Sequence, residues 1–185
     1  MRLSGAWILL ICATVGTTTM LLLLHLTQLG YLMHEHIRDR PRRRMFLASV
    51  SFFLTFLGAR LLVLLILHNI GPFGWVTIGG KHIHHLVWGI LILLIVGFAW
   101  LAEIGEEATP TSIFVSRLVS ILYGIGAALT LDEFALWLNL KNVYASPEGR
   151  TSFDAVFLFG GLLAIGAWGA PFLKALVDKC RPHRS

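Results

Sequence analysis

Histidines and carboxylates gather at the predicted ends of separate apolar segments. His82 and His85 open one such segment, Asp132 lies near the end of the next, and Asp154 lies near the start of the last. His82 and His85 are three residues apart, so they share a helix face. Imidazole and carboxylate groups together are a ligand set for zinc, iron or manganese. The sequence therefore predicts a site for one such divalent metal, with these four residues as ligands.

Further charged residues near these ligands would complete a hydrolytic site. A bound metal acidifies its coordinated water, which can then attack an ester or an amide. Glu133 and Glu148 are the expected general bases, because neither carboxylate is among the four expected metal ligands. Arg150 and Arg60 are expected to hold an anionic substrate group, because a guanidinium binds such groups through two parallel hydrogen bonds. For Arg60, which lies deep in an apolar segment, an ion pair with Asp132 or Glu133 is the alternative.

The sequence also predicts where the side chains near the expected metal ligands point. His84 lies between His82 and His85 in the sequence and is expected to point toward the loop or the lipid headgroups. Asp132 and Glu133 are adjacent, so we expect at most one of them to point fully into the interior. Asp154 also has a purely structural interpretation, because it follows two hydroxyl residues and suits the first turn of a helix.

Known histidine motifs do not match this spacing. The run 81–85 contains no H-E-x-x-H sequence. It also departs from the H-x-x-H-H box of membrane desaturases, because Lys81 occupies the position of the first histidine. The pattern therefore argues against a diiron desaturase, and the predicted metal site matches neither of these motifs.

Long apolar segments must position all these residues. Of the 185 residues, 56% are hydrophobic and 14% are charged, whereas about one quarter of a soluble domain is charged. A helix of ~20 apolar residues crosses the hydrocarbon core of a bilayer, and the runs are too long for barrel strands. We predict an all-α polytopic membrane bundle that forms one domain over 1–185. Its five transmembrane helices are expected at about 5–33, 45–70, 83–101, 112–138 and 153–177.

Basic residues set the predicted orientation. Five arginines lie between positions 38 and 44, and four basic residues lie between 174 and 184. Both regions are cytoplasmic by the positive-inside rule, so the N-terminus is outside. The net charge of +5 is then topogenic, and no nucleic acid partner is expected. This topology places the expected metal site at the outer end, and the acidic loop with Glu103, Glu106 and Glu107 at the cytoplasmic end.

Small residues on the fourth segment indicate close helix packing. Gly124 precedes Ala128 by four residues, and Gly126 precedes Thr130 by four. Such spacing lets two helix backbones approach each other closely.

Three stretches resemble a known group of proteins. They are 81–89, 131–138, and the region of 143–154 that includes Glu-Gly-Arg-Thr-Ser-Phe-Asp. Together they are similar to uncharacterised multi-span integral membrane proteins of bacteria, chiefly actinobacteria, over about the C-terminal two thirds of the chain. The resemblance implies a multi-pass protein of a bacterial plasma membrane and transfers no activity.

Two functional hypotheses remain open. The first is an outward-facing, metal-dependent hydrolase that acts on a lipid or envelope substrate. The second is a non-enzymatic assembly partner or small transport component, whose outer cluster is a structural ion network. Five helices hardly enclose a transport path and no inverted repeat is visible, so the second hypothesis implies a homo-oligomer or a membrane-protein partner. In both, the lipid bilayer surrounds the protein.

Overall fold

Five helices make up nearly all of the described structure. The computed structural model describes residues 5–26, 37, 39–71, 74, 77–78, 81–82, 84–135 and 150–168. The helices are α1 (Gly5–Leu26), α3 (Arg40–Leu67), α4 (His85–Leu101), α5 (Pro110–Asp132) and α7 (Arg150–Trp168). Between α3 and α4, the two-residue strands β1 (Thr77–Ile78) and β2 (Lys81–His82) pair antiparallel. The predicted all-α class is confirmed.

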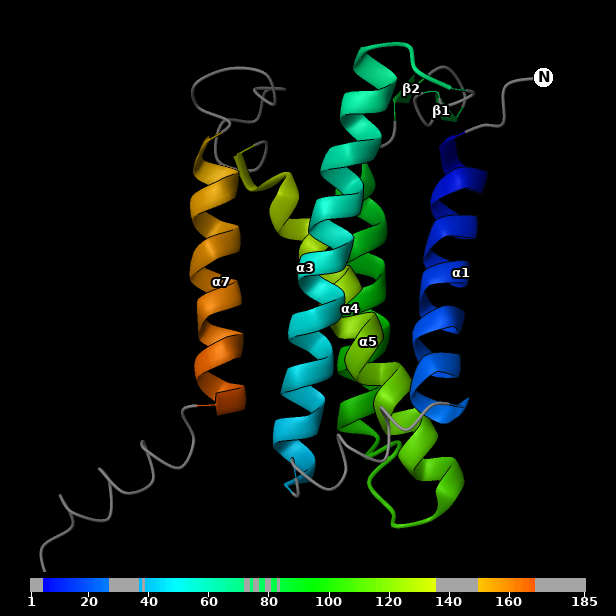
Figure 1. The fold of residues 1–185 in the computed structure, drawn as a ribbon, viewed down its shortest axis with the longest axis vertical. Helices are drawn as coiled ribbons and strands as arrows, with labels where there is room; N and C mark the ends of the chain where they lie inside the picture. The colour runs from blue at the N-terminus through cyan, green and yellow to red at the C-terminus, as the bar shows by residue number, and fades with distance from the viewer. Residues whose placement is uncertain are drawn as a thin grey trace, which may run out of the picture.

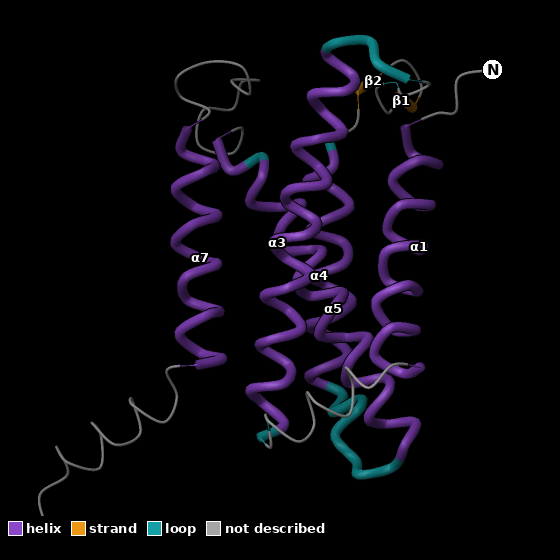
Figure 2. Tube along the Cα trace, in the orientation of Figure 1, coloured by secondary structure: helices purple, strands orange, loops and turns teal. Residues whose placement is uncertain are grey.

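Consecutive helices run in opposite directions along the long axis (Figure 1). Helix α5 contacts each of the other four helices. One end of the bundle collects the ends of α3 and α5 with the starts of α4 and α7, and we call it the histidine end, after His84 and His85. The opposite end holds the start of α3 and the loop between α4 and α5 (Figure 2). We call it the arginine end, after Arg40 and Arg44.

Glycines allow α5 to lie directly against its neighbours. A Cβ atom on Gly124 would overlap the carbonyl oxygen of Ala48 and the side chain of Ser51 in α3. A Cβ atom on Gly126 would lie 3.0 Å from the carbonyl oxygen of Gly89 in α4. At Gly124 a Cβ would force the neighbouring atoms apart, and at Gly126 the neighbours would have to give slightly. The close packing predicted from the small residues of α5 is confirmed.

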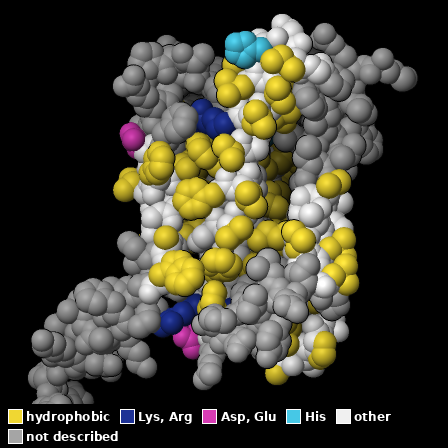
Figure 3. Space-filling view, in the orientation of Figure 1, with side chains coloured by type: hydrophobic (Ala, Val, Ile, Leu, Met, Phe, Trp, Pro, Cys, Tyr) yellow, Lys and Arg dark blue, Asp and Glu magenta, His cyan; other side chains and the backbone are white. Residues whose placement is uncertain are grey.

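Among the described residues, two helices, α3 and α5, are long and apolar enough to cross a membrane. The two helices differ in burial. In the most apolar stretch of α5, 61% is buried, whereas in that of α3 only 22% is buried. Helix α4 is also apolar but shorter, with 17 residues against 23 in α5. Hydrophobic side chains cover the middle of the visible face, and charged side chains lie toward its two ends (Figure 3).

Two element boundaries differ from prediction. Helix α3 begins at Arg40 rather than near residue 45, since Pro41 is well suited to the first turn and arginine is a good helix former. Helix α4 begins only at His85, because the glycine-containing segment before it pairs as β1 and β2. His82 lies in β2, so the expectation that His82 and His85 share a helix face is wrong.

Candidate functional site

The last residue of α5 is the centre of a polar cluster at the histidine end. The side chain of Asp132 is fully buried and forms an ion pair with Nε of Arg60, which comes from α3. Its other carboxylate oxygen lies 2.9 Å from Nε2 of His85, which opens α4. Nη2 of Arg60 also donates to the backbone carbonyl of Asp132 at 3.2 Å. The ion pair with Asp132, which was the alternative expected for Arg60, therefore forms.

Glu133 is buried beside Asp132 and has its own set of partners. One carboxylate oxygen lies 2.7 Å from Nδ1 of His84. The other accepts a hydrogen bond from the backbone N–H of Leu86 at 3.0 Å. The expectation that His84 points to the loop or headgroups is wrong. Glu133 is the C-cap residue of α5, with φ −104° and ψ 23°.

These contacts also stabilise helix ends. Helix α4 has no acidic residue in its first turn, and its N-cap residue, His84, forms no side-chain capping bond. Glu133 supplies the missing acceptor from another helix, where a negative charge is favoured by the helix dipole. Arg60 likewise donates to the backbone carbonyl of Asp132, the last residue of α5. The cluster therefore joins α3, α4 and α5.

The hydrogen bonds fix which ring nitrogens carry protons. An ionised carboxylate only accepts hydrogen bonds, so Nδ1 of His84 and Nε2 of His85 are the donors. A neutral His85 then has its lone pair on Nδ1, which lies 3.7 Å from a carboxylate oxygen of Glu133. The guanidinium of Arg60 also lies 5.3 Å from the centre of the Phe56 ring, within range of a cation–π interaction. Nδ1 of His84, Nε2 of His85 and the carboxylates of Asp132 and Glu133 thus already have partners within the protein.

The predicted metal site is only partly within the described residues. No group of three or more histidine, cysteine, aspartate or glutamate side chains is arranged to hold a metal ion in that part of the chain. His85 and Asp132 do meet, whereas Asp154 is exposed on α7 and has no hydrogen bond or ion pair to any described residue. The side chains of His82 and Arg150, and the whole of Glu148, lie outside what the structure describes.

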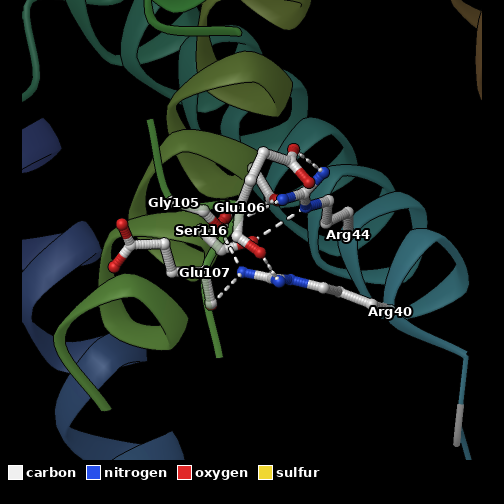
Figure 4. Close-up of polar contacts among 7 residues, drawn as sticks. Arg40, Arg44, Gly105, Glu106, Glu107 and Ser116 are labelled. Carbon is white, nitrogen blue, oxygen red and sulfur yellow. Dashed lines mark hydrogen bonds and ion pairs between the residues drawn. The ribbon is translucent and has the colours of Figure 1, made fainter. Parts of the chain in front are cut away.

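A second polar cluster at the arginine end was not predicted from the sequence (Figure 4). Arg40 and Arg44 lie one turn apart on α3 and point toward the loop between α4 and α5. Arg40 donates to the carbonyl oxygens of Gly105 and Glu106 and to that of Glu107 at 3.0 Å. Two arginines spaced by four, facing an acidic loop on the same predicted side of the membrane, were the signal that could have revealed it.

Arg44 completes this cluster through side chains. It donates from Nε to the hydroxyl of Ser116 on α5 at 2.8 Å and from Nη1 to the carboxylate of Glu106 at 2.7 Å. The hydrogen bond from Arg44 is the main reason that the pKa of Glu106 lies below its ordinary value of 4.5; desolvation opposes it, and the charges of Arg44 and Arg40 lower the pKa further. Gly105, with φ +84°, makes the turn that presents these oxygens.

No protein-family model matches the chain, and no curated protein or solved structure is significantly similar to it. The fold and the site by themselves define an all-α protein with two apolar helices of membrane-spanning length and a buried Arg–Asp–His cluster at one end.

Proposed function

We propose that the protein is a multi-pass integral membrane protein. The burial of α3 supports this, because a core helix of a soluble protein would be covered on most sides, yet α3 exposes Leu54, Leu57 and Leu61 by 55–67%. Helices α4 and α7 present similar faces, with Phe98 70% and Leu158 77% exposed. Exposed apolar surface of this extent is unfavourable in water and favourable in lipid.

The arginine end faces the cytoplasm in this proposal, and the membrane is a bacterial plasma membrane. The arginines of α3 lie at the same end as the loop that follows α4, as an antiparallel arrangement requires. Their number and position satisfy the positive-inside rule. The histidine end and the N-terminus then face outward.

Labelling of single cysteines in intact cells tests this orientation. Cys12 and Cys180 are first replaced by serine, and a cysteine is then introduced at Asp154 or at Glu107, both of which are exposed. A membrane-impermeant maleimide is expected to label Asp154→Cys in intact cells and Glu107→Cys only after permeabilisation. The reverse pattern would overturn the orientation, and equal labelling of both in intact cells would overturn the membrane placement.

Within this framework we propose a non-enzymatic role, as a component of a membrane assembly or of a small transport system. The histidine end is then an ion network that fixes three helices relative to one another. The observation that carries this proposal is the environment of Asp132, which is fully buried with both carboxylate oxygens and the backbone carbonyl engaged by Arg60 and His85. The protein would work as a homo-oligomer or with a membrane-protein partner, because five helices hardly enclose a path by themselves.

The alternative is the metal-dependent hydrolase. It would need His85 and Asp132 to exchange their present partners for a metal ion, and removing one partner of a buried ion pair costs about 3–5 kcal/mol. Glu133 would have to act as a base although it already binds His84 and the start of α4. The existing contacts therefore favour the structural network over the metal site.

Metal analysis of the purified protein separates the two functions. The protein is prepared in mild detergent without a histidine tag, as wild type and as His85→Ala, and both are resupplied with zinc, iron and manganese. Neither form is expected to retain a stoichiometric metal. About one metal per chain, retained by wild type and lost in His85→Ala, would overturn the structural role and direct assays toward lipid and envelope substrates.

A further inference from the structure

Helix α1 exposes one face along the edge of the bundle. It lies at the edge opposite α7 and contacts the other described helices mainly through α5 (Figure 1). Met20 and Leu21 point inward and pack against the buried cluster that includes Ile121 and Ile125 of α5. We call the opposite side the outer face of α1. Its side chains are exposed in the described part of the chain, and they are Val15, Thr18, Thr19, Leu22 and Leu26.

The outer face of α1 has the spacing of a contact between two helices. Its central row is formed by residues at alternating intervals of four and three, namely Val15, Thr19, Leu22 and Leu26. This heptad spacing lets two helices pack against each other along their length. Val15, Leu22 and Leu26 are 58%, 49% and 74% exposed. The described helices therefore leave this row largely uncovered.

Two hydroxyl groups interrupt the apolar side chains of this face. Thr18 and Thr19 are exposed, and neither side chain forms a hydrogen bond to any described residue, including the carbonyls one turn earlier in α1. They lie ~20 Å along the helix from Gly5 and ~11 Å from Leu26. In the membrane placement proposed above, this depth lies within the hydrocarbon core. Acyl chains provide no hydrogen-bond partner there, so an unpaired hydroxyl is unfavourable.

The exposed faces of α3 and α4 differ from that of α1. Exposed side chains of α3 include Leu54, Leu57 and Leu61, and those of α4 include Leu94 and Phe98. Lipid tails are as apolar as leucine, so such side chains are satisfied by lipid and need no protein partner. The hydroxyls of α1 are not satisfied in this way, because they need a donor or an acceptor at the same depth.

We propose that the outer face of α1 binds the same face of a second copy of the chain, as a parallel pair of helices. A two-fold axis along the membrane normal brings each residue of α1 to the depth of its own copy. A hydroxyl both donates and accepts, so identical hydroxyls at one depth satisfy each other. Thr18 and Thr19 then form hydrogen bonds between the helices, and Val15 and Leu22 pack around them. This inference rests on the proposed membrane placement, and it identifies the interface of the homo-oligomer that the proposed function calls for.

Cysteine cross-linking of the full-length chain in cell membranes tests this interface. Single cysteines are introduced into a chain whose Cys12 and Cys180 are replaced by serine, and the membranes are then oxidised. Thr19→Cys and Leu22→Cys are expected to give disulfide-linked dimers, because each position meets its own copy. Thr17→Cys is the matched control and is expected to give none, because Thr17 lies ~160° around the helix from Thr19.

Removal of the hydroxyls measures their contribution to the dimer. Thr18→Val and Thr19→Val keep the shape of the side chain and remove the hydroxyl. Each is expected to raise the dimer dissociation constant about three- to thirtyfold in sedimentation equilibrium in mild detergent, as loss of a hydrogen bond between membrane helices implies. Thr17→Val is expected to leave the constant unchanged. The thermal unfolding midpoint checks that each variant is folded.

The outcomes separate this interface from the proposed function. Equal cross-linking of Thr17→Cys and Thr19→Cys, or wild-type dimer affinity in the double variant Thr18→Val/Thr19→Val, would overturn the interface. Cross-links from the outer face to a different protein would overturn the second copy as its partner. No cross-link at Thr19→Cys or Leu22→Cys, together with the expected maleimide labelling, would overturn the interface alone. Failure of the maleimide labelling would overturn the membrane placement and this inference with it.

Discussion

The histidine end and the arginine end both join an arginine of α3 to carboxylates near α5, yet they differ in burial. At the histidine end, the side chains of Arg60 and Asp132 are 16% and 0% exposed. At the arginine end, those of Arg44 and Glu106 are 21% and 47% exposed. Water competes for the second pair and is excluded from the first. Removing one partner is therefore expected to destabilise the protein more at the histidine end than at the arginine end.

This difference follows from the solvation of the charge that remains after its partner is removed. A buried charge without its partner cannot be solvated, so the loss is large. An exposed charge without its partner is solvated by water, so the loss is small. The arginine end gains order mainly because Arg40 and Arg44 bind backbone carbonyls of a loop whose shape depends on Gly105. The histidine end is an ionic lock between helices, and the arginine end is a loop anchor.

Removal of the Asp132 charge is expected to have the largest effect. Asp132→Asn leaves Arg60 buried without its counter-charge, which we expect to lower the free energy of unfolding by about 3–5 kcal/mol. Denaturant or thermal unfolding in mild detergent measures the loss. Asp154→Asn is the matched control, since this carboxylate is exposed on α7 and should change stability by less than about 0.5 kcal/mol. Equal effects of the two variants would contradict the buried lock.

The second largest effect is expected at Glu133. Glu133→Gln removes a charge that binds His84 and the start of α4, and hydrogen bonds to charged groups contribute about 1.5–3 kcal/mol. Unfolding is again the measurement, with Glu107→Gln as an exposed control at the opposite end. A loss no greater than that of the control would show that Glu133 does not stabilise α4.

A double-mutant cycle sharpens the assignment of partners within the lock. His84→Gln combined with Glu133→Gln should show a coupling energy of about 0.5–3 kcal/mol, because the two side chains are in contact. His84→Gln combined with Asp132→Asn should be closer to additive, since Asp132 binds His85 instead. Strong coupling in the second cycle and none in the first would exchange the histidine partners.

At the arginine end, the backbone of Gly105 is expected to matter more than any single charge. Gly105→Ala places a Cβ 2.9 Å from the backbone nitrogen of Ser116, at φ +84°. A left-handed conformation costs an L-residue about 1–2 kcal/mol, and we expect a loss of that order in thermal unfolding. Gly97→Ala on α4 is the control, because nothing lies within 4 Å of the added atom. A tolerated Gly105→Ala would mean that the loop does not depend on this turn.

Glu106 is expected to show the smallest effect, with a distinctive pH dependence. Its folded pKa is lowered below 4.5, so the folded state favours the ionised carboxylate. Its contribution is complete above pH 4.5 and is lost as the pH falls through the lowered pKa. Thermal unfolding of wild type and Glu106→Gln should therefore differ slightly at neutral pH and converge in acid. A difference that persists unchanged to the lowest pH would contradict the pairing with Arg44.

Some of the site could be predicted and some could not. The placement of His85 and Asp132 at one end followed from apolar segments that alternate in direction, and the Arg60–Asp132 ion pair was one of the stated options for Arg60. The pairing of His84 with Glu133 was missed. It depends on where α5 ends, and a shift of one residue rotates a helical side chain by ~100°.

The sequence by itself determined the all-α class, the apolar segments and the close packing of α5. These follow from composition and from residue spacing along one segment, which are local properties. Only the tertiary structure decided that His84 meets Glu133, that His82 lies in a strand, and that Arg40 and Arg44 hold the loop after α4. Such pairs join residues 49 to 67 positions apart, so they depend on the rotation and end of each helix and on the depth at which neighbouring helices pack.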